Sequence, residues 1–222
     1  MKRAKMQRGI FITFEGSEGC GKSTQIARLA EKLQQAGKHP VVIREPGGTG
    51  VGEQIRHILK YSKQSSAMTP EAELLLFTAS RAQLVREVIQ PALEEGSVVI
   101  SDRFMDSTTV YQGVARKIDA AAVADINAFA VGSCVPNITF VMDMDAGAAF
   151  QRVLRRPRPV NAPQDRMEQE PLSFYEAVRA GYLKLAKENP GRMMVIDASR
   201  SPDEVQADIL KTLNQHCHGL FV

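Results

Sequence analysis

The chain has 222 residues, enough for one α/β domain with a sizeable core, and its 44% hydrophobic and 24% charged content is typical of a globular protein in water. A formal net charge of +3 does not indicate a nucleic-acid partner, and three widely separated cysteines indicate neither a disulfide framework nor a zinc site. No run approaches the roughly eighteen apolar residues of a membrane span, and the basic segment 1–8 lacks the apolar part of a signal peptide, so we expect a cytoplasmic protein.

Residues 9–24 predict a buried strand that breaks into a glycine-rich turn and continues as a helix. Gly16 and Gly21, followed by Lys22 and Ser23, match the phosphate-binding pattern G-x-x-x-x-G-K-[ST] in full. In this motif backbone N–H groups converge on phosphate oxygens, the lysine adds charge at the terminal phosphates, and the hydroxyl can ligate Mg²⁺. The alternative, a glycine turn with a solvated lysine, is disfavoured because the flanking strand and helix patterns agree with the motif. The predicted nucleotide-binding residues are Gly16, Ser17, Glu18, Gly19, Cys20, Gly21, Lys22, Ser23 and Thr24.

The next segments continue this order of strand and helix. Apolar residues recur at helical spacing after Lys22 until Gly37, a plausible stop, and the apolar run at 40–43 is a second strand. Strand, helix and strand in succession predict a parallel pair. Because ligands gather beyond the carboxyl ends of parallel strands, we expect the phosphate loop and residues 44–49 to lie on the same side of one sheet.

Two helices are predicted before the third strand. The first covers 51–61. The second has Thr69 as its N-cap and Pro70 at its first position, and it runs towards Gly96. Pro91 is expected to kink this helix or to end it early.

Phe77 and Arg81 lie four residues apart and therefore share one face of the second helix. Their spacing alone fits two interpretations. They are either part of a ligand site or a core aromatic residue whose rim is covered by an arginine.

Two predicted apolar strands each end in an acidic residue, and either residue could hold Mg²⁺. The strand at 97–102 ends at Asp102, and the strand at 137–143 ends at Asp143. We favour Asp102, because Arg103 and a polar cluster follow it. The cluster comprises Ser107, Thr108, Thr109, Tyr111 and Gln112.

A helix from Ala146 to Arg156 runs into an arginine- and proline-rich segment that ends at Arg166. This segment is either a solvated basic loop or a lid that closes arginines over transferring phosphates. Beyond it, the pattern predicts a helix at 172–188, a strand at 193–197 and a closing helix at 202–213.

The predicted elements give an α/β fold, a five-stranded parallel sheet flanked by helices on both faces. We find no internal repeat and no linker, so residues 1–222 are expected to form a single domain built on the phosphate loop, with a lid at about 152–170.

Several anion-binding devices fall on one side of the predicted sheet, and this co-location indicates phosphoryl transfer. The four histidines form no acid–base set, whereas arginines recur at loop positions. A phosphate monoester is largely dianionic at pH 7, because its second pKa is near about 6, so it can attack without a general base. Catalysis then consists of positioning and charge neutralisation by lysine, arginine and Mg²⁺. The residues do not name the acceptor.

The chain resembles the bacterial thymidylate kinases, a family of P-loop nucleoside monophosphate kinases, over nearly its whole length. The ordered set of motifs carries the resemblance, since each is weak alone. They are F-E-G-S-E-G-C-G-K-S-T at 14–24, R-E-P-G-G-T at 44–49, E-Q-I-R at 53–56, F-T-A-S-R at 77–81, D-R-F at 102–104, S-T-T-V-Y-Q-G at 107–113 and D-R-M-E-Q-E at 165–170.

This resemblance implies an ATP-dependent, Mg²⁺-requiring kinase of dTMP that forms a homodimer. It implies that Phe77 stacks on thymine, that Arg81 hydrogen-bonds the base, and that Thr108 and Gln112 complete the recognition, with Ser107 beside them. It further implies that Glu45 and Tyr111 lie near the deoxyribose, and that Arg56 and Arg103 lie near the acceptor phosphate. The phosphate loop contains no arginine, which resembles the lid type, with Arg156 the first candidate for the extra catalytic arginine and Arg152 the second. Arg158 and Arg166 are further candidates.

Two rival functions remain at this stage. Another small-molecule kinase, acting on a different nucleoside monophosphate or on a sugar, would use the same phosphate loop. A nucleotide switch that binds a protein partner would also use it, but the chain lacks the N-K-x-D motif that reads guanine.

Overall fold

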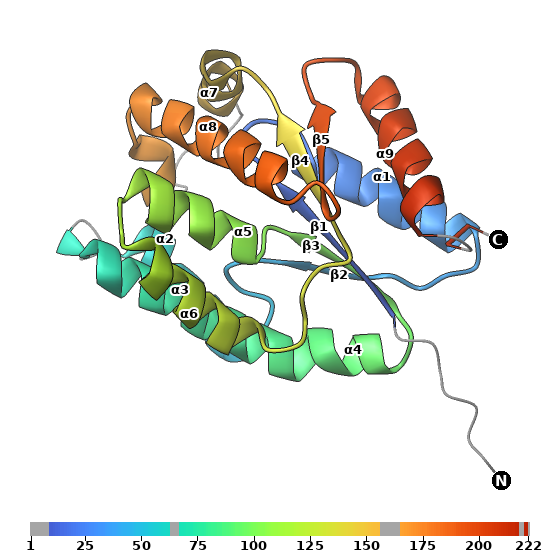
Figure 1. Cartoon of the computed structure of the whole chain (residues 1–222), viewed down its shortest axis with the longest axis horizontal. Helices are drawn as coiled ribbons and strands as arrows, with labels where there is room; N and C mark the ends of the chain where they lie inside the picture. Colours follow the sequence, from blue (N-terminus) through green and yellow to red (C-terminus); the bar gives the residue numbers. More distant parts are fainter. Residues whose placement is uncertain (1–8, 63–66, 156–164, 218–219, 222) are drawn as a thin grey trace, which may run out of the picture.

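The computed structural model describes residues 9–62, 67–155, 165–217 and 220–221. Five parallel strands form one sheet in the order β2-β3-β1-β4-β5, with β1 at its centre (Figure 1). The strands are β1 (Ile10–Glu15), β2 (Val41–Arg44), β3 (Val98–Asp102), β4 (Ile138–Asp143) and β5 (Met193–Asp197). The predicted fold class is therefore confirmed.

Helices cover both faces of the sheet (Figure 1). Alternate residues of β1 point to opposite faces, so Phe14 packs in a core with α1 and α9, whereas Phe11 packs against the opposite layer. The α-helices are α1 (Lys22–Gln35), α2 (Gly50–Tyr61), α3 (Pro70–Leu84), α4 (Gln90–Glu94), α5 (Met105–Thr108), α6 (Ala120–Val131), α7 (Ala146–Leu154), α8 (Leu172–Glu188) and α9 (Pro202–His216). Two π-helical segments, η2 (Val85–Ile89) and η3 (Thr109–Ala115), and a short 3₁₀ segment, η4 (Arg166–Gln169), complete the described elements.

The helix caps follow the sequence signals. Thr69 caps α3 by accepting a hydrogen bond from the backbone N–H of Ala72, and Pro70 is its first residue. Ser201 and Glu204 form a full capping box at the start of α9.

Pro91 is expected to kink the long helix or to end it early. The α-helical geometry of α3 ends at Leu84, and the π-helical segment η2 separates it from α4, whose first turn contains Pro91. The regular α-helix is thus interrupted ahead of the proline, which lacks a backbone N–H to donate. Helix α6 was not predicted from the sequence.

Within the described ranges, no helix is both long enough and apolar enough to span a bilayer.

Candidate active site

The phosphate loop joins β1 to α1 at the carboxyl edge of the sheet. Gly21 caps α1 with φ of 90°, and Gly16 has φ of 130°; a Cβ on Gly16 would lie 2.7 Å from the carbonyl oxygen of Met142. These positions therefore require glycine. The Lys22 ammonium folds back over the loop and donates to the carbonyl oxygens of Gly16 (3.1 Å) and Ser17 (2.7 Å). The loop thus gathers backbone N–H groups and one cation at the start of a helix, which is an anion site.

Two hard oxygen ligands meet beside this loop. Oγ of Ser23 donates to Oδ2 of Asp102 at 3.1 Å, so the predicted metal pair lies together. Asp143 instead accepts two hydrogen bonds from Arg179, at 2.7 and 3.0 Å, which leaves it poorly suited to a metal. In the described part of the chain, no three His, Cys, Asp or Glu side chains gather into a metal cluster. A Mg²⁺ ion bound here would therefore take ligands from Ser23, Asp102 and the phosphates themselves.

A cavity of about 40 Å³ opens next to the phosphate loop, and we term it the acceptor cavity. Most of the residues predicted to bind the acceptor line it, although they come from separate elements. It also includes Glu18, Pro46, Lys60 and Met167, none of which was assigned to the acceptor from the sequence. The predicted residues that line it are Glu45, Phe77, Arg103, Ser107, Thr108, Tyr111 and Gln112.

Phe77 is partly exposed within this cavity and belongs to none of the three hydrophobic clusters of the described residues. Its position favours the ligand-site interpretation over the core-packing one.

Arg103 connects the acceptor cavity to the phosphate loop. Its Nη2 lies 2.8 Å from Oε1 of Glu18, and the hydroxyl of Tyr111 donates to the other Glu18 oxygen at 2.9 Å. The Arg103 guanidinium also lies over the Tyr111 ring, 5.0 Å from its centroid. Burial works to raise the pKa of Glu18, but Arg103 and Lys22 outweigh it and hold the pKa below its ordinary value. Glu18 is therefore ionised, and it links the phosphate loop to the residues of the acceptor cavity.

The backbone of Arg103 is left-handed, with φ of 70°, which a non-glycine residue rarely adopts. Three hydrogen bonds hold this turn. The N–H of Arg103 donates to Phe14, Oγ of Ser101 donates to the Arg103 carbonyl, and the N–H of Phe104 donates to Glu15 at 2.8 Å. The turn directs the Arg103 side chain into the acceptor cavity.

Glu15 is a buried residue that the sequence analysis did not single out. Its Oε2 accepts hydrogen bonds from Oγ of Ser107 (2.6 Å) and from the hydroxyl of Tyr182 (2.7 Å). Burial, together with the nearby charge of Asp106, raises the pKa of Glu15 to about 7. Its sequence signals were its place as the last residue of an apolar strand before the phosphate loop and its place in the family motif at 14–24.

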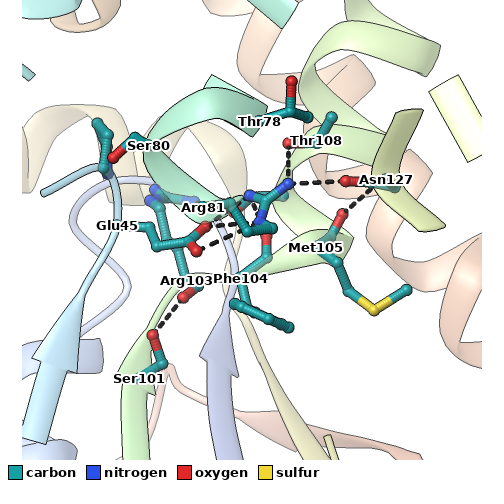
Figure 2. A network of polar contacts seen from close by, with 12 residues as sticks. Glu45, Thr78, Ser80, Arg81, Ser101, Arg103, Phe104, Met105, Thr108 and Asn127 are labelled. Carbon is teal, nitrogen blue, oxygen red and sulfur yellow. Dashed lines mark hydrogen bonds and ion pairs between the residues drawn. The ribbon is translucent and has the colours of Figure 1, made fainter. Parts of the chain in front are cut away.

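Arg81 lies behind the acceptor cavity, and Figure 2 shows its guanidinium enclosed by protein acceptors. Nε and Nη2 donate to Glu45, and Nη2 also donates to the carbonyl oxygen of Phe104. Nη1 donates to Thr108 at 2.9 Å and to Asn127 at 2.7 Å. All five N–H donors are thus engaged, and a hydrogen bond to a substrate base would have to replace one of them.

The model of the thymidylate kinase family matches residues 14–209 of the chain. The chain belongs to the thymidylate kinase family. A thymidylate kinase of Chlorobium luteolum is 47% identical over 210 residues, which cover 93% of this chain and 97% of that protein. One of Geobacter sulfurreducens is 49% identical, covering 86% and 90%. The crystal structure of thymidylate kinase from Ehrlichia chaffeensis superimposes with a TM-score of 0.73 at 33% identity, covering 93% of this chain and 99% of that one.

Three further predicted arginines, Arg56, Arg152 and Arg166, are among the described residues and do not line the acceptor cavity. Arg56, in the family motif E-Q-I-R, donates to the carbonyl oxygen of Pro46 at 2.8 Å, beside the acceptor cavity but not lining it. Arg152 is exposed on α7. Arg156 and Arg158 lie outside the described residues. Arg166 pairs with Glu73 and donates to the carbonyl oxygen of Leu59.

Proposed function

We propose that this member of the thymidylate kinase family transfers the γ-phosphoryl group of ATP to dTMP, giving dTDP and ADP for dTTP biosynthesis. The observation that carries the proposal is the ion pair between Glu18 and Arg103, because it joins an ATP-type phosphate loop to a separate set of acceptor residues. A protein that only hydrolysed a nucleotide would have no use for the second set.

The proposed chemistry needs charge control more than proton transfer. The dTMP phosphate is largely dianionic at pH 7, and its oxygen attacks the γ-phosphorus directly. Lys22 supplies positive charge on the ATP side, and Arg103 supplies it on the acceptor side. A Mg²⁺ ion held by Ser23 and Asp102 would neutralise further charge on the ATP phosphates.

We assign the remaining acceptor residues by their chemistry. Phe77 offers a flat apolar face for the thymine ring, and Thr108 and Gln112 offer polar atoms to its edge. Glu45 and Tyr111, with Ser107, line the part of the cavity assigned to deoxyribose and phosphate. Arg56 lies next to this part and is assigned to the acceptor phosphate. Because its donors are fully engaged, Arg81 is assigned to holding Glu45 and Thr108 in place.

We further propose that residues 1–222 form one kinase domain with a lid at about 152–170. An arginine of the lid, Arg156 or else Arg152, then completes the charge neutralisation. This assignment rests on the lack of an arginine in the phosphate loop and on the exposure of Arg152 at the end of α7.

A homodimer is the proposed assembly, built through the outer faces of α3 and α6. An apolar groove of about 400 Å³ runs between these helices, with Ala79, Ala82 and Ile126 among its residues. Phe129 also lines the groove, and 83% of its surface is exposed. A knob and a groove on the same face are self-complementary, which suits a two-fold interface.

We place this enzyme in the cytoplasm, where its nucleotide substrates are made and used.

A coupled assay of ADP release, run with a panel of nucleoside monophosphates, tests the activity. The proposal expects ADP release that depends on dTMP and is fastest with it. A faster reaction with another monophosphate would favour a different acceptor. Slow ADP release that no acceptor accelerates would favour a nucleotide switch.

A further inference from the structure

Glu73 is a carboxylate sealed into the wall behind the acceptor cavity, with 1% of its surface exposed. It lies in the first turn of α3 and accepts hydrogen bonds through both of its oxygens. Nε2 of Gln112 donates to Oε1 at 2.7 Å. Arg116 donates to each oxygen at 3.3 Å, and Arg166 donates to Oε2.

Two guanidinium groups on one buried carboxylate keep it ionised. Burial works to raise the pKa of Glu73, but the hydrogen bond from Gln112 and the charges of Arg166 and Arg116 outweigh it, so the pKa lies below its ordinary value. An ionised carboxylate has no proton and can only accept hydrogen bonds. Gln112 must therefore face Glu73 with its amide NH₂ group, and the opposite orientation of the amide is excluded.

This contact decides what Gln112 presents to a substrate. Gln112 lines the acceptor cavity together with Phe77. Its Oε1 accepts no hydrogen bond from the described part of the chain. This oxygen is not fully buried either. With the NH₂ group held at Glu73, Oε1 is the atom that remains to accept a hydrogen bond from the base.

We propose that Glu73 is a specificity-determining residue that acts through Gln112, fixing the amide so that the cavity accepts bases that carry a hydrogen on N3. Thymine and uracil have N3–H, whereas N3 of cytosine is an acceptor that would face the Gln112 oxygen. The proposal rests on the function proposed above, since it requires Gln112 to face the base. Glu73 itself does not touch the substrate and is a positioning residue.

The test compares wild type with Glu73→Gln, using kcat/KM for dTMP, dCMP and dUMP. In the variant, Arg116 and Arg166 will hold the new amide by its oxygen, which turns its NH₂ group towards Gln112. The Gln112 oxygen must then accept from that group, and its own NH₂ faces the cavity. We expect the ratio of dTMP to dCMP turnover to fall by about 10- to 100-fold, the usual effect of one mismatched hydrogen bond. The ratio of dTMP to dUMP should stay constant, because both bases carry N3–H.

Two controls separate this effect from a general loss of structure. Glu170→Gln removes another carboxylate that pairs with Arg116 but does not contact Gln112, so it should leave the dTMP to dCMP ratio unchanged. In a Gln112→Ala background, Glu73→Gln should cause no further change in the ratio. An equal fall in Glu170→Gln, or an additive fall in the double variant, would overturn the proposal.

Glu73→Asp covers the case in which Glu73→Gln does not fold. It keeps the negative charge for the two arginines but withdraws the carboxylate from Gln112 by one methylene, so the ratio should again fall. An unchanged ratio in a folded Glu73 variant overturns this inference and leaves the proposed kinase standing. If the wild-type protein does not phosphorylate dTMP, the proposed function itself fails.

Discussion

Arg81 and Glu45 form a buried ion pair, with 2.6 Å between Nη2 and Oε2 and side-chain exposures of 1% and 3%. The pair ties α3 to the turn after β2, and through Thr108 it reaches the wall of the acceptor cavity. Such a pair is costly to break from one side, because the partner is left as a buried charge without compensation.

We therefore expect Arg81→Ala to lower the free energy of unfolding by about 3–5 kcal/mol, the usual effect of removing one partner of a buried pair. Urea denaturation measures this loss. Arg56→Ala is the matched control, since Arg56 makes one described hydrogen bond at the cavity margin and should affect stability little. An Arg81→Ala protein of wild-type stability with a raised KM for dTMP would instead assign Arg81 to direct base contact.

Lys22→Ala should reduce kcat by about a hundred- to a thousandfold or more, because it removes positive charge from the transferring phosphates. Thermal unfolding should change little, since among the described residues the Lys22 ammonium donates its hydrogen bonds to loop carbonyl oxygens and the Cys20 sulfur. Steady-state kinetics at saturating ATP and dTMP provide the measurement. Near-normal turnover would contradict the assignment of the loop.

Phe77→Ala should raise KM for dTMP by about 10- to 100-fold, because stacking of a base on an aromatic ring contributes about 1–3 kcal/mol. Its effect on KM for ATP should be small, since Phe77 lies on the acceptor side of Glu18 and Arg103. If the variant loses stability but keeps its KM for dTMP, the ring is a packing residue after all.

Glu15 predicts a pH dependence of stability. Its pKa is about 7 in the folded chain and 4.5 in the unfolded one. Between pH 4.5 and pH 7, Glu15 is therefore protonated in the folded chain but ionised in the unfolded chain. The stability that Glu15 contributes is therefore complete below pH 4.5 and is lost as pH rises through 7, by at most about 1.4 kcal/mol per pH unit.

Glu15→Gln, which cannot ionise, should gain stability over wild type as pH rises from 5 to about 7, with no further gain above that. Urea denaturation across this range measures the difference. Glu53→Gln is the control: the hydrogen bond from Arg44 lowers the pKa of Glu53 to about 2, so Glu53 stays ionised throughout. Parallel profiles for wild type and Glu15→Gln would show that Glu15 does not titrate here.

The proposed dimer predicts that Phe129→Asp yields a monomer in sedimentation velocity, because it places a charge in the middle of an apolar face. Leu154→Asp is the control, since Leu154 is 57% exposed on α7, away from the groove. A monomeric wild-type protein, or a dimeric Phe129→Asp protein, would rule out this interface.

The parts of the fold with strong local signals were predictable from the sequence. The phosphate loop has a fixed spacing, and α8 and β5 have clear periodicities, so their predicted bounds agree with the structure. Helix α6 escaped notice because its sequence, A-A-A-V-A-D-I-N-A-F-A-V, is apolar nearly all round and shows no amphipathic period.

The site was predictable as a set of residues but not as a set of contacts. The helical spacing puts Phe77 and Arg81 on one face, yet the donors of Arg81 are taken by residues of other elements, among them Asn127, 46 residues away. Glu73 and Arg166 are 93 residues apart and meet only through the fold. Spacing reports neighbours along one element, whereas these pairings depend on how separate elements pack.

Helix α3 has Glu73 and Phe77 on the side of the acceptor cavity and Leu75 and Ala79 on the side of the outer groove. A helix is stiff over two turns, so its two sides cannot move independently. Substitutions in the groove should consequently alter affinity for the nucleotide that they never touch. The coupling must be reciprocal. A second copy of the chain bound at the groove should change the affinity for the acceptor, and the bound acceptor should change the association between copies by the same factor.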